Sequence, residues 1–330
     1  MSTRSVAAID CGTNSIRLLI SSVISLDEDE VQLLDVERRM EIVRLGQGVD
    51  KTGAFAPEAL ERTFSALRGY AELMRQHGVE FGPESVRMVA TSATRDAANR
   101  QEFVDGVRSI IGVEPEVISG DEEAELSFIG ATAELEGEDD GFKPPFLVVD
   151  IGGGSTEFVL GYAGDEGTGV VRAARSVNIG CVRMTERHLT QDPPTAEQIA
   201  AATADIDAAL DEAAGAVPID EAATVVCVAG TATTVAGIAE DLPEYDSDRI
   251  HHTQVSAERT HAIAEELLAM SHDRRAAIGV MHPGRVDVIG AGALILDRVV
   301  SRTGVGGFIA SEHDILDGIA WSLCLSEAPE

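Results

Sequence analysis

The sequence is poor in lysine, and its positive charges are few. Of 25 basic residues only Lys51 and Lys143 are lysines, and the others are arginines. The sequence has 57 acidic residues, so its formal net charge is −32. This excess argues strongly against a surface for nucleic acid or for an anionic membrane, because such surfaces are basic. We therefore expect neither a nucleic-acid partner nor a membrane partner.

Cysteine and long apolar runs are also scarce. The four cysteines lie far apart and form no CxxC pair, so neither a zinc ribbon nor a disulfide framework is indicated. No run of about 18 apolar residues is present to cross a bilayer. The first apolar segment meets Asp10 too early for a secretory signal, so we expect a cytoplasmic protein. The 330 residues exceed the roughly 250–300 that one hydrophobic core supports, which predicts two domains.

The order of predicted elements is typical of an α/β fold. Runs rich in β-branched residues predict strands at residues 5–10, 16–24, 31–45, 86–90, 115–118, 146–150 and 224–229. Apolar residues at helical spacing predict a helix from Pro57 onwards and others at 99–111, 195–214, 256–270 and 283–301. Ser119 with Glu122, and Thr195 with Gln198, fit capping boxes at helix starts. This alternation predicts layered sheets and helices.

An internal repeat relates two short segments. Asp10-Cys11-Gly12-Thr13-Asn14-Ser15 aligns with Asp150-Ile151-Gly152-Gly153-Gly154-Ser155, and both stand between apolar strands. Each copy predicts a β-hairpin whose tip amides form an anion-binding concavity, with glycine allowing close approach. The aspartates are of the type that holds Mg²⁺ beside a phosphate. For one copy alone an ordinary tight hairpin would be the better interpretation, but two copies favour two related domains, each with a phosphate loop.

A third glycine turn follows the predicted strand at 224–229. Gly230 and Thr231 open a helix there, and a helix N-terminus with glycine and hydroxyl groups suits an anion. A well-capped turn between a strand and a helix explains the same residues nearly as well.

Several motifs together resemble one family. They are Ala90-Thr91-Ser92-Ala93-Thr94-Arg95, Ser119-Gly120-Asp121-Glu122-Glu123-Ala124, the second phosphate loop through Thr156-Glu157, Asn178-Ile179-Gly180-Cys181-Val182-Arg183, Gly230-Thr231-Ala232-Thr233 and Arg285-Val286-Asp287-Val288-Ile289. These residues resemble the exopolyphosphatase and guanosine pentaphosphate phosphohydrolase (Ppx/GppA) family in its short form. That family lies within the superfamily of actin, sugar kinases and heat-shock chaperone ATPases.

The resemblance implies a fold and a division of the chain. It implies two ribonuclease H-like (actin-like ATPase) domains of the α/β class, with an interdomain active-site cleft. We expect a first domain at residues 1–121 and a second at 122–310, with a C-terminal helix at about 311–330 packing back on the first.

The resemblance also implies an activity. We expect Mg²⁺, or another divalent ion, to assist hydrolysis of the terminal phosphate of inorganic polyphosphate, with release of orthophosphate. Three alternatives stay open: hydrolysis of guanosine pentaphosphate to the tetraphosphate, a kinase or ATPase on the same fold, and a non-catalytic sensor of polyphosphate or an alarmone. A homodimer is a further option.

Roles for single residues follow from the same resemblance. Glu123 would be the general base, Glu157 would help to hold the attacking water or the metal, Asp150 would be the main Mg²⁺ ligand and Asp10 a secondary one. The expected phosphate ligands are Gly12, Thr13, Asn14, Ser15, Arg17, Thr91, Ser92, Arg95, Gly152, Gly153, Gly154, Ser155, Thr156, Gly230 and Thr231. Simpler roles are a surface acid for Glu123, an ion pair on an exposed strand for Arg17 or Glu157, and a surface salt bridge for Arg95.

Two positions depart from the family pattern. Glu125 stands where relatives often carry arginine, and Asp317-Gly318 stands where they often show an arginine-glutamate-glycine run.

The adjacent His251 and His252 are predicted to point to opposite faces of an extended segment and into solvent.

Overall fold

The computed structural model describes residues 3–25, 31–133, 135, 142–164 and 169–325. The chain divides into two units: unit 1 joins residues 1–130 to 315–330, and unit 2 comprises residues 131–314. The expected boundaries after residues 121 and 310 lie nine and four residues before these divisions. Among the described helices, none is long and apolar enough to cross a membrane.

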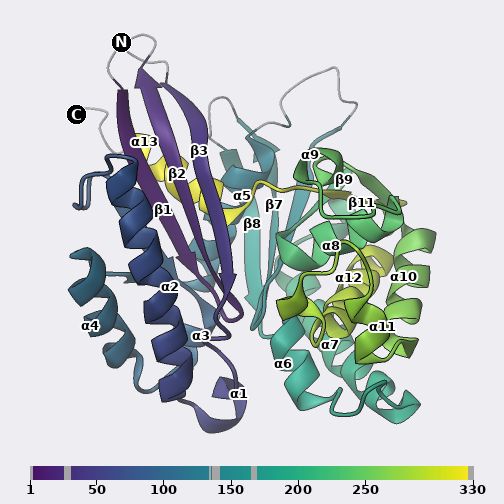
Figure 1. Ribbon diagram of the computed structural model, residues 1–330. Helices are drawn as coiled ribbons and strands as arrows, with labels where there is room; N and C mark the ends of the chain where they lie inside the picture. Colours follow the sequence, from purple (N-terminus) through teal and green to yellow (C-terminus); the bar gives the residue numbers. More distant parts are fainter. Residues whose placement is uncertain (1–2, 26–30, 134, 136–141, 165–168, 326–330) are drawn as a thin grey trace. The chain divides into compact units, whose positions relative to one another are not determined.

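Unit 1 is built on a five-stranded sheet with the order β3-β2-β1-β4-β5 (Figure 1). The strands are β1 (Thr3–Cys11), β2 (Ser15–Ser25), β3 (Val31–Ile42), β4 (Val86–Ala90) and β5 (Glu116–Val117). The helices are α1 (Val49–Thr52), α2 (Pro57–Gln76), α3 (Ser92–Asp96), α4 (Arg100–Ile111), α5 (Gly120–Thr132) and α13 (Ile315–Leu325). Strand β1 is antiparallel to β2 and parallel to β4, so it lies at the centre of the sheet.

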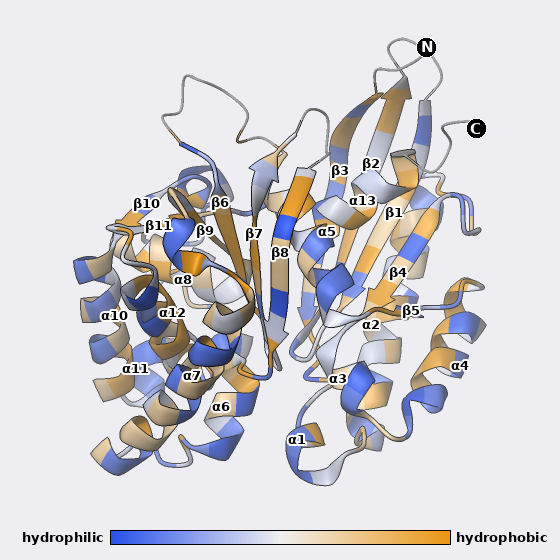
Figure 2. Ribbon diagram, turned by 180° about the vertical axis from the view of Figure 1, so that it is seen from behind, coloured by the Kyte–Doolittle hydropathy of each residue, from blue (hydrophilic) through white to orange (hydrophobic). Residues whose placement is uncertain are grey.

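Alternation along β1 supplies apolar side chains to both faces of this sheet, since neighbouring strand residues point to opposite sides. Ile9 packs with Leu67 of α2 and Phe103 of α4 on one face. Ala8 packs with Leu126 of α5 and Ile319 of α13 on the other. This second layer explains why most of α5 belongs to unit 1, and why the C-terminal helix returns to it. Orange segments, which mark hydrophobic residues, run along the inner strands in Figure 2.

The C-terminal departures from the family pattern have structural roles within unit 1. A Cβ added to Gly318 of α13 would lie 2.0 Å from the Leu126 carbonyl oxygen, so the two helices meet backbone to backbone there. Asp317 forms an ion pair with Arg38 of β3. Both residues therefore fasten α13 to the rest of the unit.

Unit 2 contains a six-stranded sheet with the order β10-β11-β9-β6-β7-β8. The strands are β6 (Phe146–Ile151), β7 (Thr156–Ala163), β8 (Gly169–Val177), β9 (Thr224–Val228), β10 (Gln254–Ser256) and β11 (Gly307–Ala310). The α-helices are α6 (Cys181–Arg187), α7 (Ala196–Ala216), α8 (Ala229–Ala239), α9 (Ser247–Ile250), α10 (Ala257–Ala269), α11 (His272–Ala276) and α12 (Ile289–Thr303). Two short 3-10 helices are η2 (Ile219–Glu221) and η3 (Pro283–Arg285). A single large core joins β6, β7 and β9 to α7, α8, α10 and α12.

The sequence repeat corresponds to a repeat of topology. In unit 1, Asp10 pairs with Arg17 across the β1–β2 hairpin and in parallel with Val89 of β4. In unit 2, Asp150 pairs with Glu157 across β6–β7 and in parallel with Val228 of β9. Each aspartate is therefore the next-to-last residue of an inner strand of its own sheet, just before a tight loop.

The predicted helix at 283–301 is wrong in its first turns. Pro283 begins the 3-10 helix η3, and α12 starts only at Ile289. Pro283 suits the first turn of either kind of helix, so its presence did not distinguish them. Here the His282 side chain accepts a hydrogen bond from the Gly284 amide, which caps the shorter turn.

Candidate active-site residues

The first phosphate loop, residues 12–15, is closed by its own backbone. The Gly12 amide donates to the Ser15 carbonyl over 3.0 Å. The carbonyls of Thr13 and Asn14 accept hydrogen bonds from amides in residues 43–46. Because the C=O and N–H of a trans peptide point in opposite directions, the amides of Asn14 and Ser15 point away from that support. The loop thus presents donors rather than acceptors, as an anion requires.

The second loop, residues 152–155, repeats this arrangement. Its Gly152 amide also donates to the Ser155 carbonyl over 3.0 Å. The carbonyls of Gly152 and Gly153 accept from the amides of residues 181–183, and the Gly154 carbonyl accepts from Arg183 Nε over 2.6 Å. The amides that follow each of these carbonyls therefore point away from residues 181–183. Two unrelated segments support the two loops in the same way.

One glycine outside the second loop allows this support. A Cβ on Gly180 would lie 2.4 Å from the carbonyl carbon of Gly153, closer than side-chain atoms approach backbone. Thr156, a predicted phosphate ligand, uses its hydroxyl to donate to the Ile179 carbonyl over 2.7 Å. We conclude that Thr156 contributes to the support of the loop.

Asp10 and Arg17 form an ion pair across the base of the first loop. Arg17 Nη2 and Nε lie 2.7 and 3.0 Å from Asp10 Oδ2. Arg17 therefore forms the ion pair of its simpler role, but the pair is largely buried rather than exposed. If Asp10 bound a metal ion, its carboxylate would be shared between that ion and Arg17. Burial and the Asp10 charge raise the pKa of Cys11, so its thiol stays protonated and is no candidate nucleophile.

Glu123 lies buried in unit 1, near the first loop. Only 8% of the residue is exposed. Arg95 Nη1 donates to Glu123 Oε2 over 2.7 Å and to the Ile118 carbonyl over 3.1 Å. Burial raises the pKa of Glu123, the Arg95 charge and a hydrogen bond with Thr91 oppose this rise, and the Asp10 charge adds to it. The predicted residues Glu123, Arg95, Thr91 and Asp10 are therefore electrostatically connected within one unit.

The other predicted phosphate ligands of unit 1 lie after β4 and in the first loop. Thr91 and Ser92 follow β4 and are buried at the start of α3. The Thr13 hydroxyl is buried, and within the described residues it has no hydrogen-bond partner. A buried hydroxyl normally has one, so the Thr13 side chain is an exception in this unit.

Asp150 and Glu157 form the acidic pair of unit 2. They are partners across β6–β7 and are only 6% and 1% exposed. Directly opposite residues of an antiparallel pair place their Cβ atoms about 4.5–5.5 Å apart on one face. Glu157 Oε1 accepts a hydrogen bond from Ser176 Oγ of β8 over 2.7 Å. Ser176 therefore fixes the direction of one oxygen of this pair.

The third turn carries an arginine that the sequence analysis did not assign. Gly230 and Thr231 lie in the first turn of α8. A Cβ on Gly230 would lie 2.3 Å from Arg285 Cζ, so the Arg285 guanidinium covers this glycine. Arg285 Nη1 also donates to Thr234 Oγ1 over 3.2 Å. The turn thus has a cation beside it as well as its own amides.

Comparison with known proteins decides the family. The profile of the Ppx/GppA phosphatase family matches residues 23–326. The chain belongs to the Ppx/GppA phosphatase family.

Similar proteins include members known from sequence and from crystal structures. Exopolyphosphatase 2 of Mycobacterium tuberculosis is 47% identical, with 98% of this chain and 99% of that protein aligned. The crystal structure of an exopolyphosphatase-like protein is 45% identical, with a TM-score of 0.88 and 98% of both chains covered. The crystal structure of the Aquifex aeolicus family member is 27% identical, with a TM-score of 0.77 over 100% of both chains. These likenesses confirm the predicted α/β fold with two domains of the actin-like ATPase type.

The acidic pair of this Ppx/GppA chain can be tested for its fit to Mg²⁺. Among the residues described, no group of three or more histidine, cysteine, aspartate or glutamate side chains is arranged to hold a metal. Mg²⁺ usually keeps several waters and binds through one or two carboxylates together with substrate phosphates. The two buried carboxylates of Asp150 and Glu157 meet that smaller requirement, so these residues fit the ion.

Two useful contacts could not be read from the sequence. Arg285 stands in a motif that the resemblance includes, but nothing in the linear sequence connects it with Gly230. Ser176 reaches Glu157 through the β7–β8 pairing, whose register shifts between Leu160 and Gly161. Counting residues along the strands would therefore have misplaced it.

The prediction for the histidine pair is wrong. The rings of His251 and His252 stack with centroids 3.8 Å apart, and neither residue is exposed. His252 has a positive φ of 62°, so this segment is not extended and the alternation rule for strands does not apply.

Proposed function

We propose that this protein is an exopolyphosphatase, which uses water to remove the terminal phosphate of inorganic polyphosphate and releases orthophosphate. The observation that carries the proposal is the buried Glu123 carboxylate, held by Arg95 near a loop of outward-pointing amides. Its relative at 47% identity, named exopolyphosphatase 2, supports the choice of substrate.

Glu123 would act as the general base. A water oxygen attacks the terminal phosphorus, the bond from that phosphorus to the bridging oxygen breaks, and the shortened chain leaves with the bonding electrons. The water proton passes to the Glu123 carboxylate. A base works best when its pKa lies near the working pH, so burial of Glu123 favours this role.

Phosphate oxygens would be bound by loop amides and by arginine. Within the described residues, both hydrogen bonds of Arg95 use Nη1, so its Nε and Nη2 donors can reach a phosphate while Nη1 holds Glu123. In unit 2, the amides of residues 153–155 and the Arg285 guanidinium over Gly230 supply donors of the same kind. Phosphoryl transfer to water needs such positive charge around the transferred group.

Asp150 and Glu157 would hold Mg²⁺. When bound, the ion neutralises charge on the phosphate oxygens and helps to orient them. Ser176 keeps Glu157 in place through the bond to Oε1. Asp10 is the weaker candidate, because its carboxylate already forms an ion pair with Arg17.

The test compares wild type with Glu123→Gln and with Glu122→Gln as a matched control. Glu122 is the neighbouring acid, but it is more exposed and pairs with Arg87. We measure phosphate release with Mg²⁺ from polyphosphates of several lengths and from guanosine pentaphosphate. Glu123→Gln should lose about 10²–10⁴-fold in kcat, and Glu122→Gln should stay close to wild type.

Other outcomes would point to the alternatives. Hydrolysis of guanosine pentaphosphate without hydrolysis of polyphosphate would replace the proposed substrate. Tight polyphosphate binding with no phosphate released would indicate a sensor. Transfer of the phosphate to an organic acceptor would indicate a kinase.

A further inference from the structure

Arg275 is a buried cation that the proposed chemistry does not use. It lies in α11 of unit 2 and is 6% exposed. Its Nη1 donates to the Met270 carbonyl over 2.7 Å, at the end of α10, and its Nε donates to the Val286 carbonyl over 3.0 Å. Its Nη2 lies 2.6 Å from Asp192 Oδ1. Burying an arginine is costly unless it is paired and hydrogen-bonded, and here it is both.

The partner carboxylate belongs to a different part of unit 2. Asp192 lies between α6 and α7, and its Oδ2 accepts a hydrogen bond from the His272 amide over 2.7 Å. Helix α6 begins with the residues at 181–183 that support the second phosphate loop. Arg275 therefore joins three segments of the unit: the end of α10, the segment between α6 and α7, and the segment that leads into α12.

The segment leading into α12 carries Arg285. Val286 is the next residue, and Arg275 holds its carbonyl, so Arg275 fixes the Val286–Asp287 peptide unit, one residue beyond Arg285. The Arg285 side chain then covers Gly230 and donates to Thr234. A long side chain can reach one place reproducibly only when the backbone that carries it is fixed.

We propose that Arg275 is a positioning residue, which through Val286 holds Arg285 over the turn at Gly230 and so sets the affinity of that turn for a phosphate group. The inference rests on the proposed function, because it takes Arg285 as a phosphate ligand. Lysine cannot replace Arg275, since a single ammonium group does not reproduce the fork of donors that serves Val286, Met270 and Asp192 at once.

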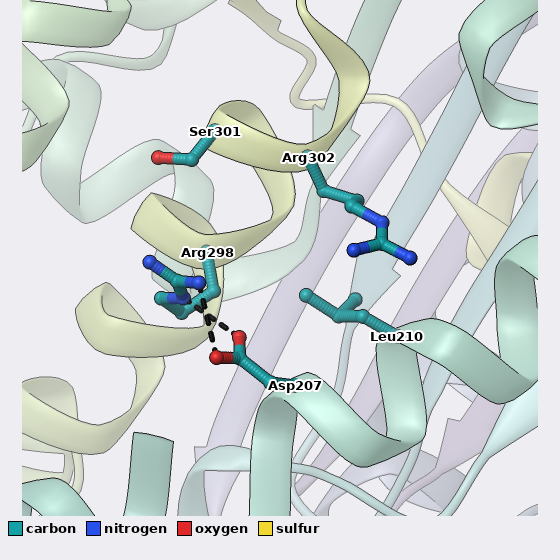
Figure 3. A pocket seen from close by; sticks show the side chains of 5 residues that line it. All are labelled: Asp207, Leu210, Arg298, Ser301 and Arg302. Atoms are coloured by element: carbon teal, nitrogen blue, oxygen red, sulfur yellow. Dashed lines mark hydrogen bonds and ion pairs between the residues drawn. The ribbon is translucent and has the colours of Figure 1, made fainter. Parts of the chain in front are cut away.

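A second arginine in unit 2 offers a matched control. Arg298 of α12 binds Asp207 of α7 through Nε and Nη2, at 2.8 and 3.0 Å. The pair lines a surface pocket of about 200 Å³ together with Leu210, Ser301 and Arg302 (Figure 3). Like Arg275 with Asp192, this arginine and aspartate join two separate segments of unit 2 by an ion pair. Unlike Arg275, Arg298 is not linked by a hydrogen bond to the segment that carries Arg285, within the part of the chain that the structure describes. Arg298→Lys therefore reports the cost of weakening an ion pair in this unit.

The experiment is a double-mutant cycle on Arg275→Lys and Arg285→Ala. We measure tripolyphosphate binding by calorimetry without divalent ions, and kcat and KM for polyphosphate with Mg²⁺. Arg275→Lys should weaken tripolyphosphate binding on the order of tenfold, because a displaced Arg285 loses a hydrogen bond to a charged group, and such a loss has an effect of that order. The double variant should bind no more weakly than Arg285→Ala, because a positioning residue has no effect once its target is gone. Arg298→Lys should bind like wild type.

Additive effects of Arg275→Lys and Arg285→Ala would overturn the inference, as would wild-type binding by Arg275→Lys. If Arg275→Lys does not fold, Asp192→Asn replaces it in the same cycle, since the amide keeps an acceptor for His272. A wild type that binds and hydrolyses polyphosphate while the cycle is additive refutes only this inference. A wild type that does neither refutes the proposed function, and the inference with it.

Discussion

Glu123 illustrates how single neighbours set the chemistry of one group. Burial and the Asp10 charge raise its pKa, and Arg95 lowers it. The carboxylate is the form that accepts a proton, so activity is present above this raised pKa and is lost as pH falls through it. We predict that on the acid side of the pH profile (the acid limb) kcat/KM falls at a pH above the ordinary pKa range of glutamate. A pH profile measures it, and Glu122→Gln should show the same limb. A limb in the ordinary glutamate range would contradict the assignment.

Arg95 provides a second prediction at this scale. Arg95→Gln keeps a hydrogen-bond donor but removes the charge that lowers the Glu123 pKa. The acid limb should therefore move to higher pH than in wild type, in addition to any loss in kcat/KM from weaker phosphate binding. The profile is recorded at several substrate concentrations to separate the two effects. An unchanged or lower limb would show that Arg95 does not act on Glu123.

Ser176 provides a third prediction. Ser176→Ala removes the hydroxyl that fixes Glu157 Oε1. Groups that orient metal ligands are typically worth about 10–100-fold in metal affinity or activity. We expect the Mg²⁺ concentration for half-maximal activity to rise by about tenfold or more. Ser109→Ala on α4 of unit 1, where the hydroxyl donates to the Gly106 carbonyl of the same helix, serves as the control. Equal Mg²⁺ dependence of the two variants would argue against metal binding by Glu157.

At the scale of elements, the support of the second loop makes a prediction about backbone contact. Gly180→Ala places a methyl group 2.4 Å from the carbonyl carbon of Gly153, so the loop has to shift. A displacement of about 1 Å costs on the order of 10²-fold in rate, and we expect a loss of that order in kcat/KM. The control is Gly215→Ala in α7, where nothing lies within 4 Å and the change should stabilise the fold by about 0.4–1 kcal/mol. Activity assays and denaturant unfolding test both, and full activity of Gly180→Ala would contradict the role of the contact.

Elements that local rules specify were predictable, and elements fixed by distant contacts were not. Strand β4 spans the predicted residues 86–90, and Thr195 with Gln198 forms the expected capping box. Ser119 caps α5 as predicted, but the Glu122 side chain turns to Arg87. The acidic run at residues 27–30 predicts a hairpin tip before the strand that follows, and it lies outside the described residues.

Within the candidate site, the repeat predicted both loops because it depends on residue types at fixed spacing. The partners of those residues come from elsewhere. Arg95 holds Glu123 across 28 positions of sequence, and Arg285 covers a glycine more than 50 positions away. Such contacts follow from the crossing of strands and helices in space, which composition and spacing do not report.

At the scale of the whole molecule, the net charge opposes the proposed substrate. A formal charge of −32 repels a polyanion at long range, which slows its approach. The screening length falls from about 30 Å at 0.01 M salt to about 8 Å at 0.15 M, whereas contacts with loop amides and arginines act over a few ångströms and are screened much less.

We therefore predict that kcat/KM for long polyphosphate rises several-fold as KCl increases across this range, at constant free Mg²⁺, while kcat at saturating substrate stays nearly constant. An enzyme whose basic surface steers an anionic substrate shows the opposite trend, because salt weakens that attraction. Sucrose at matched osmolality controls for effects on water activity. A fall in kcat/KM with salt would mean that the few arginines near the loops dominate the field that the substrate meets.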